Sequence, residues 1–243
     1  MDDHVAGRIR LIRAIREQQG LSRQTLARRA GISWKWLSTI EQGAGNPSEK
    51  AIAQLFNGLG VGAELQHNIL AQFRMNALPR AEFDAEDQAE LDAHPYPMWA
   101  QHMSSHDVYG TNEQYERMFP GIKPGTNAMV WTVTDPRARE LMPDWLHDAR
   151  VMVQWFLTMS TVLVEPAHRD EIISQCAVND IWEMLCTPLR PHLLIRRTLT
   201  VYDPEIERVR TFTRLVSEAH MPEARPWAVG KLVPRPDEPP VIG

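Results

Sequence analysis

The sequence predicts an α+β protein, in which an all-helical N-terminal domain precedes a mixed domain with an antiparallel sheet. Three observations lead to this prediction. Apolar residues recur at helical spacing, interrupted by Gly and Ser, as far as residue 76. An acidic stretch that runs into prolines separates this segment from the rest. Beyond it, segments with strand character stand at the start and at the end, with helical patterns between them, which is typical of an α+β layer.

The 243 residues divide into four predicted regions. Residues 1–76 form the helical domain, residues 77–94 an acidic linker, residues 95–234 the mixed domain, and residues 235–243 a loose Pro-rich tail. Residues 1–76 carry ten Lys and Arg against six Asp and Glu, whereas the whole chain has a net charge of −5. A basic segment on an acidic chain points to a polyanionic partner for that segment, although a solvated basic helix face explains the charge equally well.

Several classes of protein are excluded. No apolar stretch approaches the roughly 18–20 residues that span a bilayer. Two Cys cannot build a disulfide framework or a four-thiolate zinc site. The motifs of phosphate loops, zinc proteases and α/β-hydrolases are absent, so neither an enzyme nor a cofactor is expected. The first ten residues lack the apolar core of a signal peptide, and we therefore expect a cytoplasmic location.

The helical domain is expected to hold five helices, whose boundaries are marked by Gly and Ser. The residues that form this pattern are Ile9, Ile12, Gly20, Ser22, Gly31, Ser33, Ser48, Leu65, Ile69 and Phe73. Ser is a preferred helix N-cap, because its hydroxyl accepts a hydrogen bond from a free backbone N–H. Gly31 permits a sharp turn, and two short helices joined by such a turn are typical of a helix-turn-helix motif.

Residues 7–62 resemble the XRE helix-turn-helix family, which is related to phage repressors. The matching residues are Gly20-Leu21-Ser22, Leu26-Ala27, Gly31-Ile32-Ser33, Leu37-Ser38, Ile40-Glu41, Gly43, Pro47 and Leu59-Gly60-Val61, without gaps. The resemblance implies a lambda-repressor-like domain. It also implies that the domain binds a double-stranded DNA operator as part of a homodimer, with its third helix in the major groove.

The resemblance assigns the DNA-binding side chains by position. The predicted residues are Arg23, Gln24, Ser33, Trp34, Lys35, Ser38 and Thr39. Arg23 departs from the Gln that is usual in the family, and Arg favours a guanine edge or a phosphate. Two alternatives remain open, because Trp34 could pack against a neighbouring helix or a dimer partner, and Lys35 could be merely solvated.

Two further sets of charged residues are assigned in the first domain. Arg16 and Glu41 match a buried ion pair that the family uses to hold its first helix to its third, and we expect a structural role for them. The remaining basic residues are candidates for phosphate contacts, which position a protein on DNA without specifying sequence. They are Arg8, Arg10, Arg28, Arg29 and Lys50.

The mixed domain is expected to begin with two short strands, 98–102 and 106–110, and a helix after Asn112. A short apolar segment, 127–134, precedes a helix restarted by Asp135-Pro136, and a long helix runs from Asp144-Trp145 to Val164. Two short helices follow near 167–177 and 179–186. Three strands are then expected, over 194–202, 208–217 and 227–233.

Residues 95–234 resemble the MmyB-like ligand-binding domain, which follows an XRE helix-turn-helix in many bacterial regulators. The strongest motif is the segment from Thr134 to Trp145, and further matches are the segment from Asp107 to Asn112 and Trp182. The sequence departs from the family at residues 203–207, where the family favours His-Pro followed by Gly. The resemblance implies a PAS-like fold and a small, largely apolar, fatty-acid-like ligand.

The ligand candidates are mostly aromatic residues and Met, which adapt to irregular apolar ligands. They are Tyr109, Asn112, Trp131, Trp145, Met152, Trp155, Phe156, Met159, Trp182 and Arg196. For each apolar member alone, a place in the core is the stronger interpretation, and Arg196 could face water. His102 and His106 are expected on two strands of a hairpin rather than on one helix, so no metal site is predicted.

The sequence therefore predicts a bacterial, sequence-specific DNA-binding transcriptional regulator, associated with the nucleoid, whose second domain senses a small apolar ligand. One alternative is a regulator without a small ligand, whose second domain binds a protein partner. Another is an enzyme fused to a DNA-binding domain. The expected partners are thus an operator, a fatty-acid-like ligand and a second copy of the chain.

Overall fold

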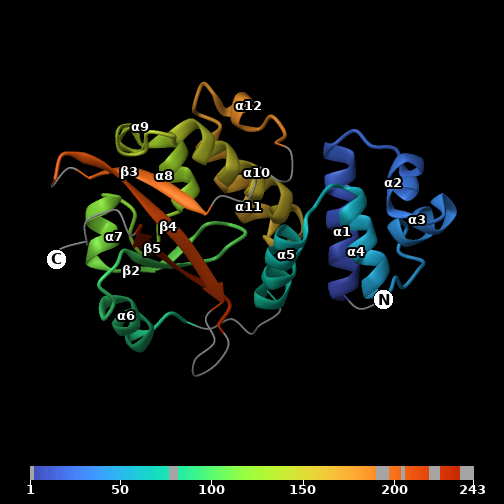
Figure 1. Ribbon diagram of the computed structural model, residues 1–243, viewed down its shortest axis with the longest axis horizontal. Helices are drawn as coiled ribbons and strands as arrows, with labels where there is room; N and C mark the ends of the chain where they lie inside the picture. Colours follow the sequence, from blue (N-terminus) through green and yellow to red (C-terminus); the bar gives the residue numbers. More distant parts are fainter. Residues whose placement is uncertain (1–2, 77–81, 190–196, 204–205, 219–224, 236–243) are drawn as a thin grey trace.

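The computed structural model describes residues 3–76, 82–189, 197–203, 206–218 and 225–235, and it confirms the α+β fold (Figure 1). The N-terminal part is helical. Its helices are α1 (Asp3–Gln18), α2 (Arg23–Ala30), α3 (Trp34–Glu41), α4 (Glu49–Gly58) and α5 (Ala63–Asn76). In Figure 1, α5 lies between the other four helices and the sheet-containing part.

The helix starts in this part follow the Ser residues noted in the sequence. The hydroxyls of Ser22, Ser33 and Ser48 cap α2, α3 and α4 by accepting a hydrogen bond from a backbone N–H three residues later. Gly31 ends α2 with a φ of +69°, a left-handed conformation that favours glycine. This turn sets α2 and α3 as a helix-turn-helix pair.

The second part combines helices with an antiparallel sheet. The strands are β1 (Met98–Gln101), β2 (Val108–Thr111), β3 (Thr198–Asp203), β4 (Arg208–Glu218) and β5 (Ala228–Pro234). The helices are α6 (Ala85–Asp92), α7 (Glu113–Met118), α8 (Ala128–Thr134), α9 (Pro136–Leu141), α10 (Trp145–Leu163), α11 (Pro166–Cys176) and α12 (Trp182–Leu185). The sheet has five strands in the order β2-β1-β5-β4-β3, each antiparallel to its neighbour.

Two helices differ from the expectation. Helix α6 lies within the stretch predicted as a linker. It begins at a capping box in which Asp84 and Asp87 each bond the other's backbone N–H, and its Leu91 is buried. The apolar segment at 127–134 is helix α8, which starts where the Asn127 side chain accepts hydrogen bonds from the N–H groups of Met129 and Val130.

The two faces of the sheet are covered by different helices, because successive side chains of a strand point to opposite sides. Trp99 packs in a cluster with residues of α7, α8 and α9. Its neighbours Met98 and Ala100 pack with Leu91 of α6 and with Trp227 on the other face.

The core of the N-terminal part is completed by the second part. Three residues of α10, Trp155, Met159 and Leu163, belong to the same buried cluster as the residues of α1 to α5. The contact is close, since a Cβ added to Gly7 of α1 would lie 2.8 Å from the Phe73 ring and 3.4 Å from Val162. The two parts therefore share one hydrophobic core. Within the described residues, no helix is long and apolar enough to cross a membrane.

Candidate functional site

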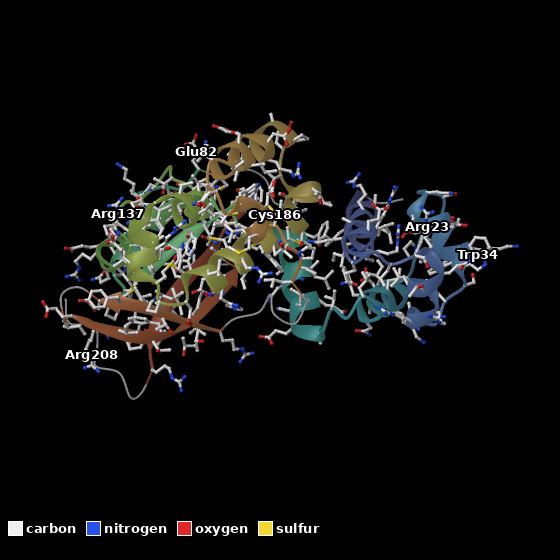
Figure 2. The ribbon with its side chains drawn as sticks, turned by 90° about the horizontal axis from the view of Figure 1, so that it is seen from above. Arg23, Trp34, Glu82, Arg137, Cys186 and Arg208 are labelled. Atoms are coloured by element: carbon white, nitrogen blue, oxygen red, sulfur yellow. The ribbon has the colours of Figure 1, made fainter. Side chains whose placement is uncertain are left out.

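The outward face of α3 presents the predicted base-reading residues. Trp34 is 51% exposed, and Lys35 and Thr39 are also exposed, whereas Leu37 and Ile40 are buried beneath them. Figure 2 shows Trp34 at the end of the molecule that lies away from the sheet. Of the other predicted DNA-binding residues, Ser33 caps α3, Gln24 is exposed and Ser38 is half-buried.

A buried ionic network ties the helix-turn-helix to α1. Arg16 donates from Nε and Nη2 to the two carboxylate oxygens of Glu41, over 2.8 and 3.0 Å. Arg23 Nε donates to the same carboxylate over 2.5 Å. The Glu41 side chain is fully buried, while Arg23 keeps 40% of its side chain exposed. The structure thus joins Arg23, predicted as a DNA contact, to the predicted ion pair of Arg16 and Glu41.

The other basic side chains of this part differ in whether they are paired with a carboxylate. Arg8 donates to both oxygens of Glu49 over 2.7 and 2.8 Å. Arg10, Arg28, Arg29 and Lys50 are exposed. A cation already paired with a carboxylate has less to gain from a phosphate, so these four are better phosphate candidates than Arg8.

A cavity of about 720 Å³ lies between the sheet, α10 and α5. Its apolar wall includes Trp99, Phe119, Ile122 and Leu232. The fifth helix of the N-terminal part closes one side, through Glu64, His67, Asn68, Ala71, Gln72 and Met75. The volume falls within the roughly 300–1,000 Å³ that is usual for small-molecule sites.

Three of the predicted ligand residues line this cavity, namely Trp131, Met152 and Trp155. The structure places the other described ones elsewhere. Phe156 and Met159 are fully buried in core clusters, and Trp182 packs at the edge of one. Arg196 lies outside the described residues.

The remaining three candidates have structural contacts instead. Tyr109 packs against Trp227 on the α6 side of the sheet, with ring centroids 5.5 Å apart. Trp145 donates from Nε1 to the Thr132 carbonyl over 2.6 Å. Asn112 is buried and caps α7, and its Nδ2 donates to the Tyr96 carbonyl over 2.7 Å.

Polar residues missed by the sequence analysis also line the cavity. Gln72, Gln101, His106 and Arg214 come from α5, β1, the β1–β2 turn and β4. His106 is buried, and its backbone has a φ of +65°, which is uncommon for a residue other than glycine. Burial lowers the pKa of His106 to about 4, so the side chain is neutral at pH 7. Its left-handed backbone, like that of Glu207, has no signature in the sequence.

A second polar group lies beside this turn. Asp107 accepts hydrogen bonds from Ser105 Oγ and from Asn127 Nδ2, and its Oδ2 lies 2.7 Å from Nε2 of His168 on α11. Burial opposes the charged form of Asp107, but these three hydrogen bonds outweigh it and lower its pKa. The hydrogen bond to Asp107 raises the pKa of His168. These contacts fix the turn that carries His106.

No metal or redox site emerges from the described residues. His102 and His106 lie in the β1–β2 turn rather than on the strands, and no cluster of His, Cys, Asp or Glu with three or more members could hold a metal ion there. Cys176 and Cys186 are free thiols, and burial raises the pKa of both. Neither thiol has the depressed pKa of a reactive cysteine.

Two protein families match the chain. A helix-turn-helix domain matches residues 10–68, from within α1 into α5. The MmyB-like transcription regulator ligand-binding domain matches residues 84–174, from the N-cap of α6 into α11. No curated protein matches the sequence. The chain therefore has the architecture of an XRE-type helix-turn-helix transcription regulator with an MmyB-like ligand-binding domain.

Proposed function

We propose that this protein binds a specific operator as a homodimer in the bacterial cytoplasm, and that a fatty-acid-like ligand in the cavity sets its affinity for that operator. The observation that carries the proposal is the position of the cavity, which is bounded both by the sheet domain and by α5 of the DNA-binding part. A five-stranded antiparallel sheet flanked by helices agrees with the PAS-like fold expected of such a sensor.

The exposed face of α3 supports sequence-specific DNA binding. Residues in the first turns of a recognition helix reach base edges in the major groove. Lys35 supplies a cation that can bond a guanine edge, and Thr39 can bond a base or contact a thymine methyl. Trp34 offers a large apolar surface to the same groove.

The wall of the cavity supports a mainly apolar ligand. Large aromatic side chains belong to it, namely Trp99 of β1, Phe119 directly after α7, and Trp131 of α8. Burial of a hydrocarbon chain against such a wall contributes about 0.8 kcal/mol for each CH₂ group. The ligand would change operator affinity only by its differential affinity for the DNA-bound and free forms.

Native mass spectrometry of the purified full-length protein, before and after organic extraction, tests the sensor proposal. We expect a dimer with an added mass in the range of a fatty acid, which extraction removes. A dimer without added mass that also fails to bind fatty acids in titration would contradict the ligand proposal. It would favour the alternative, a regulator whose second domain binds a protein partner.

Selection of a binding site from random DNA tests the operator proposal. We expect Lys35→Ala and Thr39→Ala each to weaken binding to the selected site by about 1–3 kcal/mol and to change binding to random DNA little. Lys50→Ala is the control, since loss of a phosphate contact should weaken both kinds of DNA alike. Equal losses on both DNAs for Lys35→Ala would assign Lys35 to the phosphates.

A further inference from the structure

Three buried side chains on the wall of the cavity have polar atoms without a hydrogen-bond partner among the residues that the structure describes. They are Gln72, His106 and Trp155, which are 3%, 4% and 9% exposed. A buried polar group without a partner is costly, and the large majority of such groups in proteins are paired. Three of them on one cavity wall indicate that the cavity binds a polar group as well as a hydrocarbon.

Gln72 belongs to the DNA-binding part of the chain. Its Oε1 accepts a hydrogen bond from Ser104 Oγ in the β1–β2 turn over 2.6 Å, and its Nε2 has no partner. Leu65, Ile69 and Phe73 occupy the face of α5 that packs in the helical core. Gln72 therefore lies on a neighbouring face, which lines the cavity.

Trp155 connects the same two regions from the side of α10. It packs in the core cluster shared with α1 to α5 and also lines the cavity, and its indole N–H has no partner. Two other tryptophans do bond their indole N–H groups, since Trp131 donates to the Pro120 carbonyl and Trp145 to the Thr132 carbonyl. An indole can only donate, so its missing partner must be an acceptor.

His106 adds a polar group from the β1–β2 turn. Neither ring nitrogen has a partner at hydrogen-bond geometry, although the Met152 carbonyl is near enough to favour its charged form. The positive charge of Arg214 also acts on this ring, and Arg214 lines the same cavity. The carboxylates of Glu64 and Asp148 also line the cavity, so the choice of ligand group depends on the two hydrogen-bond donors rather than on the charge of the wall.

We propose that the cavity recognises the carboxylate of its ligand through the Gln72 amide N–H and the Trp155 indole N–H, with His106 beside them. The proposal rests on the sensor function proposed above and names the chemical group that the sensor reads. A carboxylate accepts several hydrogen bonds and suits donors that come from different elements.

One of these donors belongs to the DNA-binding part, and this has a mechanistic consequence. A carboxylate bound to Gln72 contacts α5 directly, so the ligand can shift the position of α5 relative to the sheet without an intervening relay. The Ser104 hydroxyl donates to the other end of the same amide, so this bond already links α5 to the β1–β2 turn. The ligand would thus act on a contact between the two parts of the chain.

Two probes of equal chain length test the recognition, dodecanoate as the acceptor and dodecylammonium as a donor. Calorimetric titration of the full-length protein should give dodecanoate the higher affinity. We expect Gln72→Leu and Trp155→Phe each to weaken dodecanoate binding by roughly ten- to a hundredfold, the size expected for a hydrogen bond to a charged group. Neither substitution should change dodecylammonium binding by more than about twofold.

Two matched variants control for volume and for the interdomain bond. Trp131→Phe removes an indole N–H on the same cavity that already has a partner, so it should not change the ratio of dodecanoate to dodecylammonium affinity. Ser104→Ala breaks the hydrogen bond to Gln72 but keeps the amide, and should also preserve this ratio.

The effect of dodecanoate on operator binding completes the test. In the wild-type protein, saturating dodecanoate should change the affinity for the selected operator, and in Gln72→Leu this change should be lost even at saturation. If dodecanoate leaves operator affinity of the wild type unchanged, or changes it equally in Gln72→Leu, the role of α5 is overturned.

The outcomes separate this inference from the function on which it rests. If the wild type binds neither probe, the sensor function fails and the inference fails with it. If the wild type binds both probes with similar affinity, and Gln72→Leu and Trp155→Phe do the same, the cavity is an apolar sensor site and the carboxylate proposal alone is overturned.

Discussion

Two buried polar clusters of this protein differ in how completely they are paired. In the helix-turn-helix, Arg16 and Arg23 both donate to the Glu41 carboxylate through short contacts. On the cavity wall, Gln72, Trp155 and His106 keep polar atoms without a partner, at a cost of about 1–3 kcal/mol for each unmet group. The comparison teaches that the first cluster can be explained by the fold alone, whereas the second agrees with the bound carboxylate proposed above.

The largest expected effect tests the paired cluster. Glu41→Ala should lower the free energy of unfolding by about 3–5 kcal/mol, because it leaves Arg16 buried without its carboxylate. Urea denaturation followed by circular dichroism measures this loss. The double variant Arg16→Met with Glu41→Leu should lose less, since it strands no charge on either of these residues. A double variant that is less stable than Glu41→Ala would show that the pair itself stabilises the fold.

The next effect concerns acid stability at the cavity. Because the pKa of His106 is about 4 in the folded protein and near 6.5 in the unfolded chain, the unfolded state binds more protons between these values. Stability should therefore fall as the pH is lowered from 6.5 towards 4, by up to about 1.4 kcal/mol per pH unit.

Unfolding measured across this pH range for His106→Gln should show a smaller slope than the wild type. The groups that act on this ring are Asp107, His102 and Arg214, and they remain in the variant. A slope unchanged by His106→Gln would assign the acid sensitivity to another group.

A smaller effect is expected when the unpaired cluster is made apolar. Gln72→Leu combined with Ser104→Ala removes both partners of one hydrogen bond together with the unmet amide N–H. Stability should change by less than about 1 kcal/mol, because replacing both partners by apolar groups is nearly neutral. Urea denaturation measures this change in the free energy of unfolding. A decrease as large as that expected for Glu41→Ala would contradict the distinction between the two clusters.

The smallest expected effect concerns His168, whose side chain is 41% exposed. Its pKa is raised in the folded protein by the hydrogen bond to Asp107, so its contribution to stability is complete below pH 6.5 and is lost as the pH rises through the folded-state value. His168→Gln should lower Tm slightly at pH 6 and have less effect at pH 9, with a loss below about 1 kcal/mol for such an exposed pair. His147→Gln, on the exposed side of α10, is the control.

Most elements of the fold could be predicted because their signals are local. Asn112 and Asp135-Pro136 mark helix starts by their own chemistry, and the structure has N-caps at Asn112 and Asp135. Helix α8 could not be identified, since periodicity does not separate a short buried helix from a buried strand in a mainly apolar segment of seven residues. Helix α6 was missed because the acidic composition around its capping box favoured a linker.

The candidate site was only partly predictable for a different reason. The outward residues of α3 follow from helix geometry and a known family pattern, so the exposed position of Trp34, Lys35 and Thr39 could be predicted. The role of Gln72 depends on a contact with Ser104, 32 residues further along the chain, and nothing local marks it. Trp155 and Met159 lie one turn apart on α10 and were given the same role, but only Trp155 reaches the cavity.

The shared core has a consequence for anyone who would build hybrid regulators from this chain. Fusing the ligand-binding domain to a different DNA-binding domain at residue 76 would separate α5 from the cavity that it closes. The fusion would also remove the packing partners of Trp155, Met159 and Leu163 of α10. A junction between α4 and α5, near Gly62, would keep α5 together with the cavity. The α5 residues Leu65, Ile69 and Phe73 would then have to pack against the new DNA-binding domain. The portable module of this protein is therefore longer than its ligand-binding domain by one helix.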